Sequence, residues 1–243
     1  MTLPVFLGPV AGAGVGDSLV VEEHEARHAV VVRRIRVGEH IMLVDGHGTC
    51  ATCAVTKTTK VSLVAFVESV TVTPAPTPHV TVVQAIPKGD RAELAVEVLT
   101  EIGVDRIVPW AAARSIGSWR GERATKSLAR WRSTAREAGK QSRRAWFPEV
   151  TTQATTVEVA GIVGDFDLAV VLHETATVPF SSLSLEGVSS VLVVVRPEGG
   201  ITEEELAVLD SAHVVRMGDS VLRTSTAGVA AVAALLSRTS RWD

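Results

Sequence analysis

Short β-rich segments, separated by turn residues, fill the first part of the chain. The segments predicted as strands are 30–32, 40–44, 53–55 and 61–67. Asp45-Gly46 and Gly48 supply hairpin turn chemistry between two of them. Three prolines within residues 73–78 then favour a stiff extended connector. We therefore expect a small β-barrel domain over residues 1–72, with one short helix at about 22–28.

After the connector, apolar runs of strand length alternate with helical patterns. Strands are predicted at 80–86, 106–109, 167–173 and 191–195, and helices at about 90–102, 122–139 and 226–237. In the middle helix, Leu128, Trp131 and Ala135 share one face and basic residues cover the other. Strands alternating with helices predict a parallel sheet covered on both faces, so residues 79–243 are expected to form an α/β domain.

The most informative stretch begins with the apolar run Val191–Val195. Such a run is typical of a strand that is buried on both faces. The next residues, Pro-Glu-Gly-Gly at 197–200, end the strand and supply backbone that turns sharply or approaches a ligand closely. A Thr-x-x-Glu capping box at 202–205 then starts a helix. An ordinary βα turn has the same local pattern, but a second loop of this kind at 217–228 favours a ligand site at the carboxyl edge of the sheet.

Composition indicates a soluble globular protein, with 46% hydrophobic and 21% charged residues. The longest apolar runs are too short to span a bilayer. The first residues lack the basic region and apolar core of a signal peptide. We therefore expect a cytoplasmic protein.

Charge is unevenly distributed along the chain. The net charge is −3, yet residues 114–144 contain ten Lys or Arg and two Glu, a local charge of +8 that leaves −11 for the rest. This asymmetry predicts a polyanion-binding face on an otherwise acidic protein.

The two cysteines, Cys50 and Cys53, admit three interpretations. A zinc site needs two more ligands, and only His40 and His47 are near in the sequence. A redox pair is expected to open a helix, whereas this pair lies in a β-rich region. Two ordinary thiols in a reducing compartment is therefore the favoured interpretation.

Two common nucleotide-binding architectures lack support. No Gly-Lys-Ser/Thr phosphate-binding signature is present, so nucleotide hydrolysis has no basis in the sequence. Glycines at 12–16 superficially match a dinucleotide fingerprint but do not lie in a βαβ unit, and a flexible loop is favoured there. A Rossmann enzyme carries its glycine loop after the first strand, whereas the glycine loops here lie in the last third of the chain.

Four motifs together resemble one known family. Leu99–Val104, the Pro-Glu-Gly-Gly-Ile-Thr-Glu-Glu-Glu run at 197–205 and the segment 217–227 are similar to RsmE-type 16S ribosomal RNA uridine-N3 methyltransferases of the SPOUT superfamily. Residues 28–46 resemble the PUA-like RNA-binding domain of that family. The resemblance covers essentially the whole chain, with the motifs in the family's order.

The resemblance implies a fold and an activity. A SPOUT-type domain with a trefoil knot and a parallel sheet is expected at 79–243, preceded by a PUA-like β-barrel at 1–72. The implied reaction is S-adenosylmethionine-dependent methylation of a uridine in 16S ribosomal RNA, with the assembled small subunit as partner and a homodimer as the active form. A trefoil knot is a rare exception to the rule against threaded chains, and it is expected here only because of the resemblance.

Three loops are implied to hold the cofactor, largely through main-chain groups. The residues are Leu172, His173, Glu174, Pro197, Gly199, Gly200, Met217, Gly218, Val221 and Leu222. Met217, Val221 and Leu222 are expected to pack against the adenine, although plain core positions explain Met217 and Leu222 equally well.

Methyl transfer to N3 of uridine requires positioning of two reacting atoms and removal of a proton. Arg223 is the candidate to stabilise the developing anion or to hold the target nucleotide. Glu198 is the candidate to orient a loop or accept the proton. A solvated charge or a loop-locking ion pair is the alternative interpretation for each.

RNA contacts are expected from basic residues in both parts of the chain, and phosphate neutralisation by them makes binding steeply salt-dependent. The candidates are Arg33, Arg34, Lys88, Arg114, Lys140, Gln141, Arg143 and Arg144. For any single residue, a solvated surface charge is the competing interpretation.

Three positions depart from the family pattern. Arg196 stands where Gly is usual, Ser225 where Glu is usual, and Val5 where an arginine is common. Two alternatives to the implied function therefore stay open. One is another SPOUT methyltransferase that acts on a ribose 2′-hydroxyl or on transfer RNA, and the other is a catalytically silent RNA-binding factor.

Overall fold

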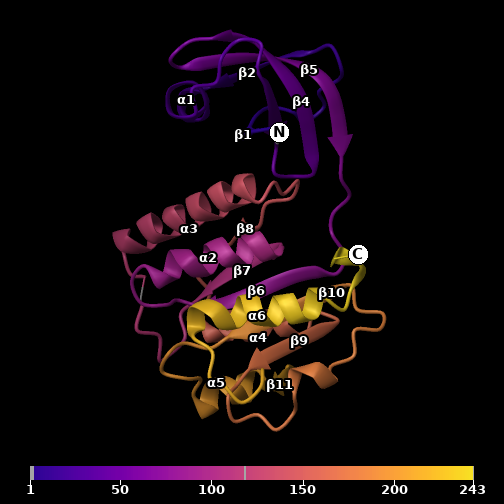
Figure 1. Cartoon of the computed structure of the whole chain (residues 1–243). Coiled ribbons are helices and arrows are strands. Elements are labelled where there is room, and N and C mark those ends of the chain that lie inside the picture. The colour runs from indigo at the N-terminus through magenta and orange to yellow at the C-terminus, as the bar shows by residue number, and fades with distance from the viewer. Residues whose placement is uncertain (1–2, 118, 243) are drawn as a thin grey trace. The chain divides into compact units, whose positions relative to one another are not determined.

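The computed structural model describes residues 3–117 and 119–242 (Figure 1). The chain forms two compact units. One contains the residues up to Ala75 together with Gly139–Phe147, and the other contains Pro76–Ala138 and the residues from Pro148 onward. The predicted division at residues 73–78 did not include a return of the chain at 139–147.

The first unit is built on a five-stranded sheet in the order β1-β3-β4-β5-β2. Its strands are β1 (Val5–Leu7), β2 (Ser18–Glu22), β3 (His40–Val44), β4 (Thr49–Thr58) and β5 (Ser62–Val72). Neighbours pair antiparallel except β1 with β3, which are parallel. The predicted turn between β3 and β4 is confirmed, since the Asp45 carboxylate accepts hydrogen bonds from the amides of His47 and Thr49.

The strand predicted at 30–32 is wrong. Helix α1 (Glu23–Arg27) continues directly into a π-helical turn, His28–Val32. The three valines of this turn, at 30–32, are β-branched, and such residues favour a strand locally. In this unit Ala29 is buried and Val32 is exposed, and the Arg33 amide donates back to the His28 carbonyl. Packing of the helix therefore overrides the local preference.

Residues 139–147 pack as part of this first unit. The Gly48 amide donates to the Ala145 carbonyl, and the Trp146 indole donates to the Thr73 carbonyl at 2.9 Å. Lys140 forms an ion pair with Glu25, with 3.0 Å between Nζ and Oε1. The Lys140 side chain is only 5% exposed, so its ammonium is engaged inside the unit.

The second unit contains six strands, all parallel, in the order β11-β9-β10-β6-β7-β8, as the alternating pattern predicted. They are β6 (His79–Ala85), β7 (Arg106–Trp110), β8 (Glu149–Val150), β9 (Leu168–Leu172), β10 (Ser190–Val195) and β11 (His213–Val215). The helices are α2 (Arg91–Ile102), α3 (Glu122–Gln141), α4 (Thr156–Val163), α5 (Glu203–Val208) and α6 (Thr224–Leu236). The last residues of α3, from Gly139 on, belong to the first unit.

Helices cover both faces of this sheet. One core layer combines sheet residues with buried residues of α2, α3 and α6, including Leu99, Trp131 and Leu235. The other combines the opposite sheet face with α4 and α5, including Val159 and Val163. In Figure 1, α6 lies in front of the sheet beside α2. Within the described residues, no helix is long and apolar enough to cross a membrane.

The predicted capping box at the start of α5 is confirmed, and it carries a further contact. Thr202 Oγ1 accepts from the Glu205 amide, and Glu205 Oε2 accepts from the Thr202 amide. Glu205 is buried, and its Oε1 also accepts from the Ala113 amide at 2.8 Å and the Thr156 hydroxyl at 2.9 Å. This carboxylate therefore ties the loop after β10 to the loop after β7 and to α4.

Candidate cofactor pocket and catalytic edge

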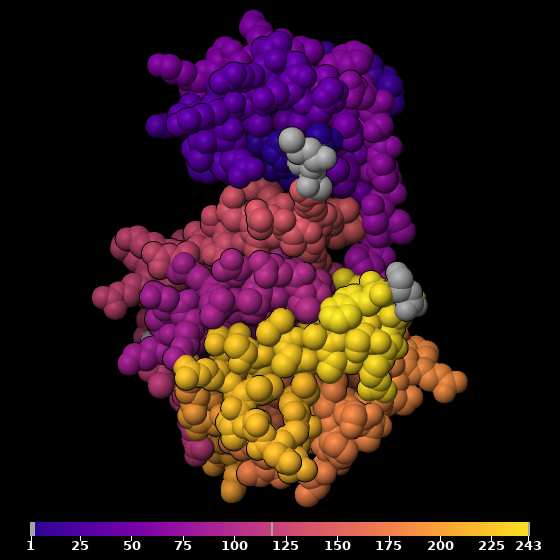
Figure 2. All heavy atoms as spheres, viewed as in Figure 1, coloured from indigo at the N-terminus to yellow at the C-terminus, as the bar shows by residue number. Residues whose placement is uncertain are grey.

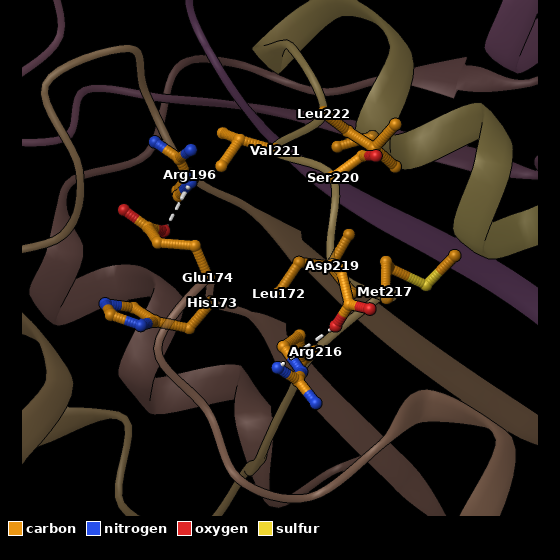
Figure 3. A pocket seen from close by; sticks show the side chains of 12 residues that line it. Leu172, His173, Glu174, Arg196, Arg216, Met217, Asp219, Ser220, Val221 and Leu222 are labelled. Carbon is orange, nitrogen blue, oxygen red and sulfur yellow. Dashed lines mark ion pairs between the residues drawn. The ribbon is translucent and has the colours of Figure 1, made fainter.

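A pocket lies at the carboxyl ends of β9, β10 and β11 (Figure 3). Its volume is about 50 Å³, and it is open to solvent. The lining residues are Leu172, His173, Glu174, Arg196, Arg216, Met217, Gly218, Asp219, Ser220, Val221, Leu222 and Ala227. Parallel strands end at a common edge, and here that edge meets the start of α6, so residues from four separate segments converge.

The segments are held in place by the sheet. The amide of His173 donates to the Val215 carbonyl at 2.9 Å, which extends the β9–β11 pairing to the pocket. The Arg216 carbonyl accepts from the Phe180 amide, and the Arg216 amide donates to the Val178 carbonyl. The chain segments on either side of the pocket are therefore hydrogen-bonded to each other.

The pocket combines apolar side chains with two ion pairs. Leu172, Met217, Leu222 and Ala227 supply the apolar part. Arg196 Nε lies 2.7 Å from Glu174 Oε2, with the side chains 15% and 35% exposed. A second pair, between Arg216 and Asp219, is longer, at 3.5 Å, and much more exposed. Because each cation has an anion beside it, the two ion pairs add no net charge to the lining.

Seven of the ten predicted cofactor residues line this pocket. They are Leu172, His173, Glu174, Met217, Gly218, Val221 and Leu222. The other three, Pro197, Gly199 and Gly200, lie in the loop after β10 and are not among the lining residues. The structure therefore brings two of the three expected loops directly to the pocket, and the third contributes Arg196.

The glycine loop after β10 has a packing role. A Cβ atom on Gly199 would lie 2.8 Å from both the Cβ and the carbonyl oxygen of Arg114. Gly200 adopts φ +77, a left-handed conformation that favours glycine, and its amide donates to the Pro197 carbonyl at 3.0 Å. Both glycines are thus required by the turn and by its approach to the segment carrying Arg114.

The two catalytic candidates lie outside the lining, and both are exposed. Arg223 is the N-cap residue of α6, and its carbonyl accepts from the amides of Thr226 and Ala227. Glu198 Oε1 accepts from the Lys88 amide at 3.4 Å, so it bridges the loops after β10 and β6.

The RNA-binding candidates are divided between the two units. Lys88 and Arg114 belong to the second unit and are exposed, and Arg114 Nη1 approaches the Gly199 carbonyl at 3.5 Å. The other six belong to the first unit: Arg33, Arg34, Lys140, Gln141, Arg143 and Arg144. Of these, Lys140 departs from the expectation of an exposed cation because it is buried against Glu25.

Five lining residues were not among the predicted cofactor residues: Arg196, Arg216, Asp219, Ser220 and Ala227. Asp219, Ser220 and Ala227 lie within residues 217–228, the second loop that the sequence pattern assigned to a ligand site, so that motif could have identified them. Arg216 follows a three-residue strand too short to be recognised from periodicity. Arg196 was noted only as a departure from the family pattern, yet its side chain enters the pocket.

A second cavity, of about 210 Å³, lies at the carboxyl end of β6 between α2 and α3. Its lining includes Trp119, Trp131 and the Arg130–Glu93 ion pair. Although larger, it contains none of the predicted cofactor residues. The smaller pocket is therefore the candidate cofactor site.

The cysteine pair and the candidate pocket belong to different units. Both thiols lie in the first unit and are free, and burial raises the pKa of each, that of Cys53 to about 11. Among the described residues, no group of three His, Cys, Asp or Glu is placed to hold a metal ion.

Comparison with known families agrees with this architecture. The RNA methyltransferase domain family matches residues 73–236, and the RNA methyltransferase PUA domain family matches residues 21–68. The chain therefore belongs to the RNA methyltransferase family.

Individual relatives narrow the family further. The chain is 44% identical over 234 residues to the ribosomal RNA small subunit methyltransferase E of Mycobacterium bovis, covering 94% of this chain and 89% of the relative. It is 34% identical over 167 residues to the protein of the same name from Bacillus subtilis, covering 65% of each. The solved structure of the Neisseria gonorrhoeae methyltransferase E bound to S-adenosyl methionine matches with a TM-score of 0.88 at 28% identity, over 97% of this chain and 98% of that one. Within its family, the protein groups with the small subunit methyltransferase E proteins.

Proposed function

We propose that the protein transfers a methyl group from S-adenosylmethionine to N3 of a uridine in 16S ribosomal RNA. The observation that carries the proposal is the convergence of the 172–174 and 216–222 segments with Arg196 in one pocket at the sheet edge. Small subunit methyltransferase E proteins are similar over nearly the whole chain, and one is described with this cofactor bound.

The residues of the pocket fit the cofactor's chemistry. Apolar Leu172, Met217 and Leu222 suit the adenine, and the Arg196–Glu174 pair suits charged groups. The exposed residues 218–221 form part of the pocket lining.

The bound cofactor supplies an electrophilic methyl group on its sulfonium. This methyl group would form a bond to uridine N3 as its bond to sulfur breaks, which leaves S-adenosylhomocysteine, and the N3 proton would pass to solvent. Arg223, at the start of α6 next to Leu222, would stabilise the charge that develops on the uracil oxygens. The contact of Glu198 with the Lys88 amide favours a loop-orienting role for this carboxylate.

The proposal includes the finer architecture of the SPOUT superfamily. The trefoil knot would involve the loops that follow β9, β10 and β11, which are the segments that meet at the pocket. The first unit would act as a PUA-like barrel that binds RNA, with Arg33, Arg34 and Arg143 as exposed cations. The active form would be a homodimer, and light scattering showing only monomer at micromolar concentration would contradict that part.

A methyl-transfer assay tests the reaction. Purified protein is incubated with labelled S-adenosylmethionine and small ribosomal subunits from a strain that lacks the enzyme, and the modified atom is mapped by mass spectrometry. Label on uridine N3 is expected. Label on a ribose 2′-hydroxyl, or on transfer RNA in a parallel reaction, would identify a different methyltransferase, and absence of label from both substrates would favour an RNA-binding factor.

Replacing Arg223 tests its assigned role. Arg223→Ala is expected to lower turnover by about 10²-fold or more, because it would remove the proposed donor to the developing charge, while RNA affinity changes little. Arg223→Lys, which keeps the charge, is expected to recover part of the rate. Unchanged turnover in the alanine variant would show that another group stabilises the reacting base.

A further inference from the structure

We propose that the Arg196–Glu174 pair recognises the amino-acid end of the cofactor, with Arg196 binding its carboxylate and Glu174 its ammonium group. The inference rests on the proposed cofactor and assigns one end of it to two named side chains. Figure 3 shows the pair at one side of the pocket, with Glu174 in the loop after β9 and Arg196 directly after β10.

The position of Arg196 is set by two contacts. Its Nε lies 2.7 Å from Glu174 Oε2, and its Nη1 donates to the Pro197 carbonyl at 3.2 Å. A guanidinium has five N–H donors, and these two contacts, the ones found for it among the described residues, leave donors for a second carboxylate. An arginine already held in place loses little further side-chain entropy when it binds an anion.

The charge pattern matches the ligand. The methionine part of the cofactor carries an ammonium and a carboxylate on one carbon, so it is itself a pair of opposite charges. A neutral protein pair presents a cation to the carboxylate and an anion to the ammonium without placing net charge in the pocket. Ion pairs shielded from water interact more strongly than exposed ones.

Lower solvent exposure favours this pair over the Arg216–Asp219 pair as the site for the charged end of the cofactor. Arg196 is 15% exposed and Glu174 35%. In the second pair, Arg216 is 42% exposed and Asp219 97%, and the two atoms are 3.5 Å apart, so solvent screens that interaction. The apolar residues Leu172, Met217 and Leu222 suit the adenosine end, which leaves the less exposed of the two ion pairs for the charged end.

The competing assignment is that Glu174 binds the ribose hydroxyls. A carboxylate alone is sufficient for a diol, and Arg196 would then serve only to hold Glu174. The two assignments predict different losses of affinity for cofactor analogues that lack one or both amino-acid charges.

Calorimetric titration with three ligands separates them. The ligands are S-adenosylmethionine, its decarboxylated form, which keeps the ammonium, and 5′-methylthioadenosine, which has neither charge. Arg196→Gln is expected to lower the affinity for S-adenosylmethionine by about ten- to a hundred-fold. The affinities for the other two ligands should change little, because only S-adenosylmethionine carries the carboxylate. Glu174→Gln is expected to lower the affinity for both ligands that carry the ammonium group and to leave the affinity for methylthioadenosine unchanged.

The control variant is Arg130→Gln. It breaks the ion pair between Arg130 and Glu93, whose N–O distance is 2.9 Å, and neither residue lines the candidate pocket. It is expected to leave all three affinities unchanged, and thermal melts of every variant establish that the fold is retained. Equal weakening of S-adenosylmethionine and its decarboxylated form by Arg196→Gln would overturn the inference, as would loss of methylthioadenosine binding in Glu174→Gln. If the wild type bound methylthioadenosine but not S-adenosylmethionine, the proposed cofactor itself would fail; if it bound all three and Arg196→Gln did not discriminate, only the pair's role would fail.

Discussion

Gly199 illustrates how a residue in a recognised motif acts through packing. The sequence pattern placed it among the groups that contact the cofactor. In the structure it faces Arg114, and a side chain there would meet the backbone oxygen and Cβ of that residue at 2.8 Å. The motif lies at the edge of the sheet that carries the candidate pocket, but the contact that requires glycine is with the protein itself.

We predict that Gly199→Ala destabilises the protein by about 1–3 kcal/mol, because a methyl group would overlap atoms that cannot move without shifting the Arg114 backbone. Urea unfolding measures the change. Gly161→Ala, at an exposed position of α4 with open space around it, is the matched control and is expected to be neutral or slightly stabilising. Equal stability of the two variants would show that the loop moves to accommodate the methyl group at no measurable cost in free energy.

Asp167 links the starts of two buried strands. Its Oδ2 accepts hydrogen bonds from both the hydroxyls and the amides of Ser189 and Ser190, at 2.6–3.0 Å. Of these, the Ser189 hydroxyl does most to lower the pKa of the carboxyl, which falls from 3.8 to about 2. The charged form is thus favoured in the folded state.

The stabilisation by Asp167 is predicted to be lost in acid. It is complete well above pH 3.8, where the carboxyl is ionised in both the folded and the unfolded state. Below that pH the unfolded chain takes up the proton first, so the contribution declines until the pH reaches about 2. Stability of wild type and Asp167→Asn, measured from pH 2 to pH 6, should therefore converge as the pH falls, and a constant difference would contradict the linkage.

At the scale of elements, helix α6 shows what close packing requires. Its predicted span, 226–237, agrees with the observed Thr224–Leu236 to within two residues. Periodicity did not indicate how near it approaches its neighbours. A Cβ on Gly228 would lie 3.1 Å from Leu99 of α2 and 3.2 Å from Val195 of β10, so the helix rests on both through a residue without a side chain.

Gly228→Val is predicted to push α6 away from β10 and to cost about 1–3 kcal/mol in the free energy of unfolding. Because Ala227, one residue earlier, lines the pocket, affinity for S-adenosylmethionine should fall as well. Gly161→Val introduces the same atoms in α4, where a Cβ would have no neighbour within 4 Å. This variant should change neither the free energy of unfolding nor the cofactor affinity appreciably. Unaltered cofactor affinity in Gly228→Val would show that the pocket is insulated from this helix contact.

At the scale of the whole molecule, the last helical turn closes the second unit. Arg241 forms a two-point contact with Asp105, at 2.6 and 3.3 Å, and donates to the carbonyls of Pro78 and Gly103. Asp105 also accepts from the Val80 amide at 2.9 Å. Residues more than 130 positions apart are thereby joined at the amino-terminal edge of the sheet, opposite the pocket.

Arg241→Met is predicted to destabilise the protein by about 3–5 kcal/mol, because it leaves a carboxylate of 7% exposure without its cation. Arg130→Met removes an exposed pair and should cost less than about 1 kcal/mol. Thermal or urea unfolding compares the two. Similar losses would indicate that the terminal contact is no stronger than a surface ion pair.

The sequence by itself determined the features that depend on neighbouring residues. Apolar runs and helical periodicity identified the major strands and α2, α3 and α6, and the Thr202–Glu205 box located the start of α5. Family motifs indicated the edge of the sheet at which a ligand would bind. These signals are local, because backbone hydrogen bonding and capping join residues a few positions apart.

Only the tertiary structure decided which side chains meet. Lys140 is buried because Glu25 lies beside it, 115 positions away in the chain. Arg196 lines the pocket because β9 and β10 are neighbours, so Glu174 can neutralise it. Strand order and burial set such contacts, and no local pattern encodes them, because the free energy of a charge depends on the partner and solvent that the completed fold places around it.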